Sequence, residues 1–135
     1  MKEAVKVAKV GLLNNEVPVG AVFVDANANE LLAKSHNLTT RTKNATTHCE
    51  VNCIREISAK NNGQMPENCC VYVTVEPCIM CAYALNLAGV KRVVFGCRND
   101  KFGGNGSILS LNYFGGAPKY EVVSGVMSNE AVQLL

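Results

Sequence analysis

The stretch CVYVTVEPCIMCAYALNLAGVKRVVFG, residues 70–96, gives the strongest indication of the fold class of this 135-residue chain. It begins with a β-branched and apolar run that predicts a strand over residues 70–75. A helix is predicted over residues 78–88, between a proline that suits its first turn and a glycine that suits its end. A second strand is predicted over residues 91–96. A strand, a helix and a strand in this order indicate neighbouring strands joined by a crossover helix.

The residues before this unit predict a helix and a hairpin. Lysines and apolar residues alternate at helical spacing, which predicts an amphipathic helix that ends near Asn14. The run VGAVFVD, residues 19–25, is too continuously apolar for a half-exposed strand and predicts a buried one. A turn-forming stretch leads from it to a second strand over residues 30–35, which completes the hairpin.

A second long helix is predicted to begin at a threonine cap, Thr46 or Thr47, and to end near Lys60. The C-terminal part of the chain predicts a glycine-rich loop (102–107), a strand (120–123) and a short helix capped by Ser128.

Together these elements predict an α/β fold, a three-layer α/β/α sandwich around a mixed five-stranded sheet. The chain is 48% hydrophobic, and its length fits one domain over residues 1–135. The net charge of +2 is far from the strongly basic balance of dedicated nucleic-acid binders, so charge leaves the substrate class open. The first residues lack the apolar run of a signal peptide or membrane anchor, which predicts an intracellular protein of the cytoplasm or nucleus.

Cys78 and Cys81 lie three positions apart at the start of the predicted helix. A helix N-terminus stabilises the thiolates that a metal ion requires. The same C-x-x-C spacing also occurs in redox dithiols and in pairs of packed cysteines. On its own, the spacing therefore leaves three interpretations open: metal binding, redox chemistry and packing. The other four cysteines outside the two motifs lie in apolar patterns that predict packing: Cys53, Cys69, Cys70 and Cys97.

His48 and Glu50 form a second motif, also at a predicted helix start. His48 with the two cysteines would give three protein ligands for zinc and leave the fourth position to water, as in catalytic zinc sites. Glu50 could instead form a capping box with Thr47, a purely structural role. The other histidine, His36, has no thiol or carboxylate spaced to join it, which favours an ordinary surface or core position. The combination H-x-E and P-C-x-x-C is the pattern of zinc-dependent nucleobase deaminases.

From its first helix to nearly its last residue, the chain resembles the tRNA-specific adenosine deaminases, which have the cytidine deaminase-like fold. The resemblance lies in EVPVGAVFV (16–24), VTVEPCIMC (73–81) and VVFG (93–96). The segment GCRNDKFGGNGSIL, residues 96–109, is similar to the catalytic subunit of the eukaryotic heterodimeric wobble adenosine deaminase. Three departures are an unusual Cys49 in place of alanine, a short C-terminal helix and the absence of a basic tail.

The resemblance implies hydrolytic deamination of adenosine to inosine in tRNA, at the anticodon wobble position. One Zn²⁺ per chain would activate a water, and Glu50 would shuttle the protons. The implied metal ligands are His48, Cys78 and Cys81. Substrate contacts are implied for Asn37, for the wall formed by Val17, Pro18 and Val19, and for the backbone of Cys49 and Pro77.

The partners that the resemblance implies are a tRNA anticodon stem-loop and a second deaminase chain, either a related non-catalytic subunit or another copy. Alternatives are a deaminase of free bases or nucleosides, of guanine or cytosine type, and a non-catalytic zinc scaffold. Five residues are candidates for RNA contacts, although each equally suits an ordinary surface or packing role: Arg41, Lys43, Arg98, Lys101 and Phe102.

Overall fold

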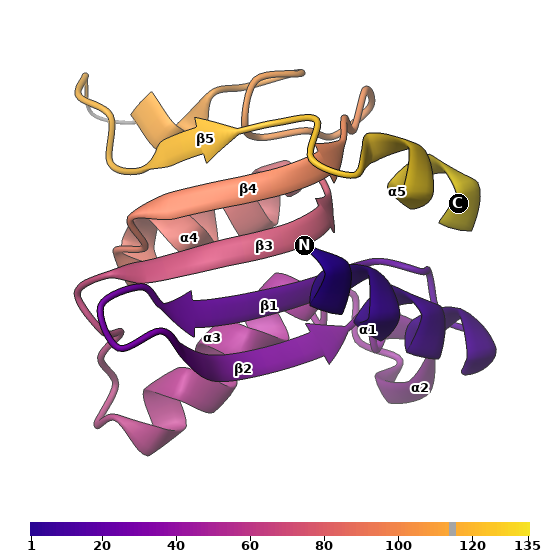
Figure 1. Cartoon of the computed structure of the whole chain (residues 1–135), viewed down its shortest axis with the longest axis horizontal. Helices are drawn as coiled ribbons and strands as arrows, with labels where there is room; N and C mark the ends of the chain where they lie inside the picture. The colour runs from indigo at the N-terminus through magenta and orange to yellow at the C-terminus, as the bar shows by residue number, and fades with distance from the viewer. Residues whose placement is uncertain (114–115) are drawn as a thin grey trace.

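The computed structural model describes residues 1–113 and 116–135, and within them five strands form one sheet in the order β2-β1-β3-β4-β5 (Figure 1). β1 pairs antiparallel with both β2 and β3, whereas β3, β4 and β5 run parallel. The predicted mixed five-stranded sheet is thus confirmed. The strands are β1 (Gly20–Asp25), β2 (Glu30–His36), β3 (Cys69–Val75), β4 (Arg92–Cys97) and β5 (Glu121–Val123).

Helices cover both faces of the sheet, which confirms the three-layer α/β/α arrangement (Figure 1). One face carries α1 and α5, and the other carries α3 and α4, the crossover helix between β3 and β4. The sequence did not indicate the short α2 or the 3-10 helix η1. The bounds are α1 (Lys2–Leu13), α2 (Thr39–Thr42), α3 (Cys49–Lys60), α4 (Ile79–Ala88), η1 (Leu111–Tyr113) and α5 (Ser128–Leu134).

The larger hydrophobic core lies between the sheet and the α3/α4 layer. It contains Phe23 and Phe95 from the sheet and Ile57 and Leu85 from the helices, all at most 2% exposed. Burying side chains of this size stabilises a fold by about 1.5–3 kcal/mol each. The same core takes in Cys53 and Cys69, so the predicted packing role of these two thiols is confirmed.

The predicted helix caps differ from those in the structure. The N-cap of α3 is His48, not Thr46 or Thr47, and that end of the helix has no side-chain cap hydrogen bond among the described residues. The Thr47 hydroxyl instead donates to the carbonyl of Asn44 at 2.9 Å. Ser128 is the first residue of α5 and not its cap, because Met127 takes the N-cap position.

Both N-caps that matter for the site are motif residues. His48 precedes α3 and Cys78 precedes α4, each with extended backbone angles. α3 and α4 lie against each other on one face of the sheet, so the beginnings of the two helices meet. In the part of the chain that the structure describes, none of the helices has the length and apolar character needed to cross a membrane.

Candidate active site

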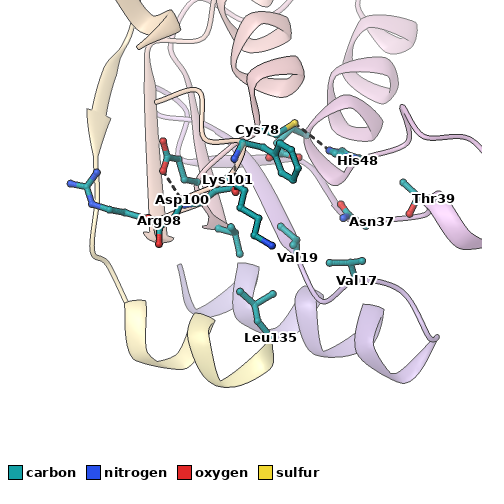
Figure 2. A pocket seen from close by; sticks show the side chains of 15 residues that line it. Val17, Val19, Asn37, Thr39, His48, Cys78, Arg98, Asp100, Lys101 and Leu135 are labelled. Atoms are coloured by element: carbon teal, nitrogen blue, oxygen red, sulfur yellow. Dashed lines mark hydrogen bonds between the residues drawn. The ribbon is translucent and has the colours of Figure 1, made fainter. Parts of the chain in front are cut away.

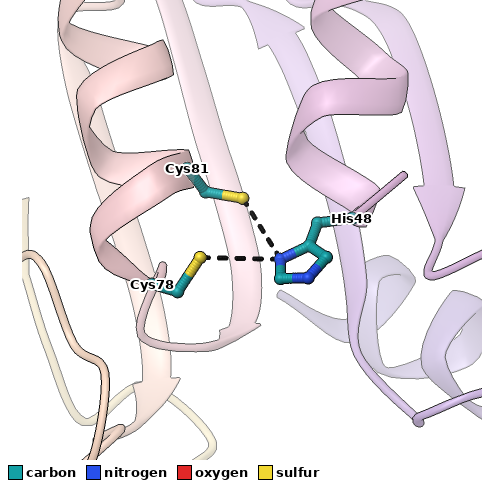
Figure 3. Close-up of side chains that lie close together, drawn as sticks. All are labelled: His48, Cys78 and Cys81. Carbon is teal, nitrogen blue, oxygen red and sulfur yellow. Dashed lines mark hydrogen bonds between the residues drawn. The ribbon is translucent and has the colours of Figure 1, made fainter. Parts of the chain in front are cut away.

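His48, Cys78 and Cys81 converge where α3 and α4 begin (Figure 3). The Nδ1 atom of His48 lies 3.5 Å from the Sγ of Cys78 and 3.5 Å from the Sγ of Cys81. All three ligand atoms lie within 4.8 Å of one another. The two sequence motifs, thirty residues apart, therefore form one cluster.

The spacing of this cluster fits a tetrahedral zinc ion. Usual zinc–sulfur and zinc–nitrogen distances, combined with a tetrahedral angle, place the two ligand atoms about 3.6 Å apart. The sulfur–nitrogen separations of 3.5 Å agree with that value. One imidazole and two thiols are a donor set that zinc prefers, and three protein ligands leave one position for water.

The two thiols of the cluster ionise differently. A hydrogen bond from Cys81 and another from His48 outweigh burial and lower the pKa of Cys78 to about 4. The hydrogen bond to Cys78, together with burial, raises the pKa of Cys81. The same contact with Cys78 raises the pKa of His48, although burial opposes it. Cys78 is therefore a thiolate at neutral pH, whereas Cys81 keeps its proton until a cation displaces it.

Glu50 lies in the first turn of α3, two residues after His48, and is 3% exposed. Burial raises the pKa of its carboxyl group, because a charged carboxylate is poorly solvated there. The thiol of Cys49 donates a hydrogen bond to its Oε2 at 3.2 Å. Since neither Glu50 nor Thr47 caps α3, the capping-box alternative is wrong.

A cavity of about 540 Å³ adjoins the cluster (Figure 2). Val17 and Val19 form one wall and Asn37 projects from another; the substrate contacts that the resemblance implies for these three residues stay predictions. His48, Glu50 and Cys78 also line the cavity. The cluster of His48, Cys78 and Cys81 and the Glu50 carboxylate thus adjoin one space that is large enough for a purine base.

Three predicted substrate contacts are not among the residues that line this cavity: Pro18, Cys49 and Pro77. The backbone N–H of Cys49 donates to the Oδ1 of Asn37 at 2.9 Å. The carbonyl of Pro77 accepts a hydrogen bond from the N–H of Gly104, also at 2.9 Å. Both backbone groups therefore have protein partners, and their contacts with a substrate stay predictions.

The structure separates the predicted RNA contacts into two groups. Arg98 and Lys101 line the cavity from the segment after β4 (Figure 2). Phe102, from the same segment, lines it as well. Arg41 lies at a different groove, beside α1 and β2. Lys43 follows α2 in a left-handed conformation and is exposed.

The remaining predicted side chains lie outside the cluster. Cys97 is buried as expected, whereas Cys70 is only half-buried. His36 is half-buried, and its Nδ1 lies 2.8 Å from the carbonyl oxygen of Asn37. These thiols and this imidazole are not part of the metal-ligating group that the described residues form.

Two buried carboxylates near the cavity were not recognised from the sequence. Glu16 accepts hydrogen bonds from the backbone N–H groups of Thr40 and Arg41. Glu76, 1% exposed, accepts hydrogen bonds from the segment after β4. Burial opposes its ionisation, but the hydrogen bonds together lower the pKa of Glu76. A sequence signal existed for Glu76, because an acid directly after an apolar strand and before proline is unusual.

Comparison with known proteins agrees with this geometry. The family model described as the cytidine and deoxycytidylate deaminase zinc-binding region matches residues 1–97. The tRNA-specific adenosine deaminase 2 of Xenopus laevis is 40% identical over 144 residues, covering 100% of this chain and 81% of the frog protein. The chain belongs to the tRNA-specific adenosine deaminase family.

Solved structures place this tRNA-specific adenosine deaminase family member among deaminases of two substrate classes. A structure from studies of A-to-I editing by tRNA:A34 deaminases has a TM-score of 0.92 and 29% identity, covering 100% of this chain and 97% of that one. A guanine deaminase from Bacillus subtilis has a TM-score of 0.67 and 31% identity, covering 72% of this chain and 61% of that one. The tRNA deaminase therefore matches more of the fold.

Proposed function

We propose that this chain hydrolyses the 6-amino group of adenosine in tRNA, at the wobble position of the anticodon, and so produces inosine. The observation that carries the proposal is the meeting of the His48, Cys78 and Cys81 cluster with buried Glu50 at a single cavity. The tRNA deaminase relatives, which match the whole chain, favour an adenosine in tRNA as the substrate.

His48, Cys78 and Cys81 would hold one zinc ion per chain. Bound zinc lowers the pKa of a coordinated water to about 7, which supplies a nucleophile at neutral pH. The residues contribute in different ways before the ion binds. Cys78 offers a ready thiolate, since its pKa of about 4 keeps it ionised, whereas Cys81 must lose a proton.

Glu50 would move the protons of the reaction. Its carboxylate would take a proton from the attacking water and deliver it to the ring nitrogen, then take the remaining proton of the new hydroxyl group and deliver it to the leaving amine. Burial raises the pKa of Glu50, so that the acid form persists long enough to act as a donor. The Cys49 thiol at 3.2 Å holds the orientation of this carboxylate.

The cavity walls would hold the purine ring. Val17 and Val19 provide an apolar surface, with Pro18 between them, and Asn37 provides the polar contact. The Oδ1 of Asn37 already accepts the Cys49 N–H, so its Nδ2 is the atom left to donate to a ring acceptor. The Cys49 N–H and the Pro77 carbonyl remain candidates for shared contacts with the base.

An adenosine in an anticodon loop must be unstacked before its base can enter such a cavity. Arg98 and Lys101 line the cavity and would hold the neighbouring phosphates, while Phe102, 62% exposed, can stack on a neighbouring base. Arg41 and Lys43 lie near Asn37 along the chain and would contact the backbone on the other side of the extruded base.

A second deaminase subunit, either a related chain or another copy, would cover an apolar surface on α4. Met80, Tyr83 and Leu87 are exposed there at helical spacing. η1 packs beside α4, where Asn86 donates to the Leu111 carbonyl at 2.8 Å, and the segment 108–113 extends the apolar surface. Contiguous apolar surfaces of this kind mark protein interfaces. Light scattering of the chain alone, and mixed with a related subunit, measures both forms of association.

The test of the proposed function is an inosine assay on an anticodon stem-loop RNA, with zinc-loaded protein and with protein stripped by a chelator. Inosine at the wobble position, lost on stripping and restored by zinc, is the expected result. Adenosine, guanine and cytidine are assayed in parallel, because the structural similarity to a guanine deaminase makes a free base the alternative substrate. Turnover of a free base without turnover of the RNA would reject the tRNA substrate.

A further inference from the structure

Glu76 joins two neighbouring elements at the end of the sheet that faces the cavity. It follows β3 directly and is 1% exposed. Its Oε2 accepts hydrogen bonds from the backbone N–H of Asn99, at 3.0 Å, and from the Ser107 hydroxyl. Its Oε1 accepts from the backbone N–H groups of Asn105 and Ser107, both at 3.0 Å. All four donors belong to one segment, residues 99–107, which follows β4.

The 99–107 segment is shaped to receive this carboxylate. A Cβ atom on Gly103 would lie 2.5 Å from the Oε1 of Glu76, so only glycine allows this approach. A second anchor lies on the far side, where the Asn105 amide donates to the Tyr120 hydroxyl at 2.6 Å. The Tyr120 hydroxyl in turn donates to the carbonyl of Ala82 in α4 at 3.2 Å.

The same segment touches the helix that begins beside Cys78. The N–H of Ile79, the first residue of α4, donates to the carbonyl of Phe102 at 2.8 Å. The N–H of Gly104 donates to the carbonyl of Pro77 at 2.9 Å. Glu76 therefore fixes a segment whose backbone is bonded to the start of α4 on one side and carries a cavity wall on the other.

Five consecutive residues of the cavity wall, 98–102, lie in the anchored segment or directly before it. We propose that Glu76 is a positioning residue, whose buried carboxylate holds this wall in the conformation that binds the nucleic-acid substrate. It acts through the segment, since all four hydrogen bonds of its two oxygens come from residues 99–107. The RNA part of this proposal rests on the proposed function, whereas the anchorage itself does not.

Glutamine at position 76 separates the hydrogen bonding of this side chain from its size. The two carboxylate oxygens of Glu76 each receive two donors. A glutamine amide has one oxygen and one NH₂ group, and the NH₂ group would face either the Asn99 N–H, with the Ser107 hydroxyl turned to accept, or the N–H groups of Asn105 and Ser107. Glu76→Gln thus removes at least one backbone hydrogen bond of the anchorage without opening a cavity.

Glu16, which precedes Val17 of the cavity wall but does not itself line the cavity, offers a matched comparison. It is 5% exposed and accepts the N–H groups of Thr40 and Arg41 at 2.9 and 2.8 Å. Glu16→Gln also alters a buried, hydrogen-bonded carboxylate, but its donors belong to α2. If each acid anchors only its own segment, the two variants will loosen different parts of the chain.

The experiment is hydrogen exchange of the zinc-loaded full chain. In Glu76→Gln we expect the amides of residues 99–107 to exchange at least tenfold faster, with an unchanged zinc-to-protein ratio. In Glu16→Gln we expect faster exchange in residues 39–42 alone. Ser107→Ala, which removes only the hydroxyl donor, should give a smaller effect on residues 99–107 and serves if Glu76→Gln fails to fold. Two results would overturn the anchorage. One is an unchanged exchange rate of residues 99–107 in both Glu76→Gln and Ser107→Ala, and the other is exchange in Glu76→Gln that is equally faster across the whole sheet.

Kinetics test whether the anchorage serves substrate binding. For an anticodon stem-loop RNA, Glu76→Gln is expected to raise KM at least fivefold and to leave kcat within about twofold. Glu121→Gln, which removes an exposed carboxylate paired with Arg92 at 2.9 Å, should leave both values unchanged. A fivefold or larger fall in kcat of Glu76→Gln, with KM unchanged, would overturn the binding role. If wild-type protein made no inosine, the proposed function would fail, yet the exchange experiment would still decide the anchorage.

Discussion

The backbone N–H of Cys49, at the start of α3, donates a 2.9 Å hydrogen bond to the Oδ1 of Asn37, which follows β2. This contact joins the exit of the hairpin to the helix that carries Glu50, twelve residues later in the chain. It also assigns the two ends of the Asn37 amide, since the oxygen must face the N–H. The Nδ2 group is consequently the part of Asn37 that faces the substrate cavity.

Asn37→Asp tests that assignment, because aspartate keeps the acceptor for Cys49 and loses the donor. We expect kcat/KM on RNA to fall by about 10–100-fold, the value of about 1–3 kcal/mol for a buried group left without its partner. Because Asn37 is 7% exposed and a buried carboxylate is poorly solvated, the unfolding free energy of Asn37→Asp is measured as well, and activity is compared where the variant is folded. Asn37→Ala removes both ends, so it should lose activity and also about 1 kcal/mol of stability, measured by urea denaturation. Wild-type kinetics in Asn37→Asp would contradict the assignment.

Glu50→Gln keeps the volume of the side chain and removes its capacity to transfer a proton. We expect kcat to fall by about 10²–10⁴-fold, the usual contribution of general acid–base catalysis. Zinc content and RNA affinity should match wild type, because the metal cluster consists of His48, Cys78 and Cys81. Single-turnover inosine formation, metal analysis and fluorescence anisotropy measure the three quantities. A variant that retained wild-type turnover would remove Glu50 from the mechanism.

Cys49→Ala is expected to change the pH dependence of the reaction. Burial raises the pKa of Glu50, and the thiol hydrogen bond from Cys49 works in the opposite direction. Removing the thiol should therefore raise this pKa further. Glu50 must be ionised to accept a proton, so activity on the acid side should be lost at a higher pH than in wild type.

Profiles of kcat against pH for wild type, Cys49→Ala and Cys49→Ser measure this shift. Serine keeps a donor at the same position, so its acid limb should stay close to that of wild type. The difference between the three proteins should shrink as the pH rises, because a higher pH favours the ionised form of Glu50 in each. Superimposable profiles for alanine and wild type would show that the thiol has no influence on Glu50.

The hydrophobic pattern of the sequence predicted most of the fold. The features that it did not predict depend on contacts between residues far apart in the sequence. Strand and helix bounds came within about two residues, because alternating or helical apolar spacing is local. The cap of α3 was missed because the imidazole of His48 must face Cys78 and Cys81, a requirement of the tertiary structure. Glu16 and Glu76 were missed because their donors lie 23–31 residues away.

Zinc binding should release protons, and their number should depend on which of His48, Cys78 and Cys81 are protonated before the ion binds. Near pH 7 Cys78, with a pKa of about 4, is already ionised and releases none. Cys81 keeps its proton, because its hydrogen bond to Cys78 and its burial raise its pKa. Binding should therefore release about one proton or more, and zinc affinity should rise as pH increases.

Calorimetric titration of the stripped chain with zinc, in buffers of different ionisation enthalpy, counts the released protons. Cys81→Ser removes the thiol that must be deprotonated, so it should release fewer protons and bind zinc more weakly. A heat of binding that is independent of the buffer would mean that no proton leaves, which is incompatible with a protonated Cys81 before binding.

Gly20 is expected to be the least replaceable glycine beneath α1. A Cβ atom at this position would collide with the carbonyl oxygen of Ala4 and lie 2.5 Å from the backbone nitrogen of Ala8. Backbone atoms of a helix cannot move aside singly, so α1 as a whole would have to lift from β1. We expect Gly20→Ala to lower the unfolding free energy by about 1–3 kcal/mol, as overpacked cores do.

Gly11→Ala is the matched comparison, since it adds the same methyl group to the same interface. Its Cβ would meet the Cβ of His36 at 2.9 Å, an atom that side-chain rotation cannot move, so α1 and β2 must part by a few tenths of an ångström; this is a smaller displacement than the backbone contacts of Gly20 demand. Alanine is also favoured over glycine within a helix by about 1 kcal/mol, which offsets the crowding. Urea denaturation should therefore show a large loss for Gly20→Ala and a small change for Gly11→Ala. Val19 precedes β1 and forms part of the cavity wall, so lifting α1 should also weaken RNA binding in Gly20→Ala. If the two variants were equally stable, the α1–β1 contact would tolerate the added methyl group.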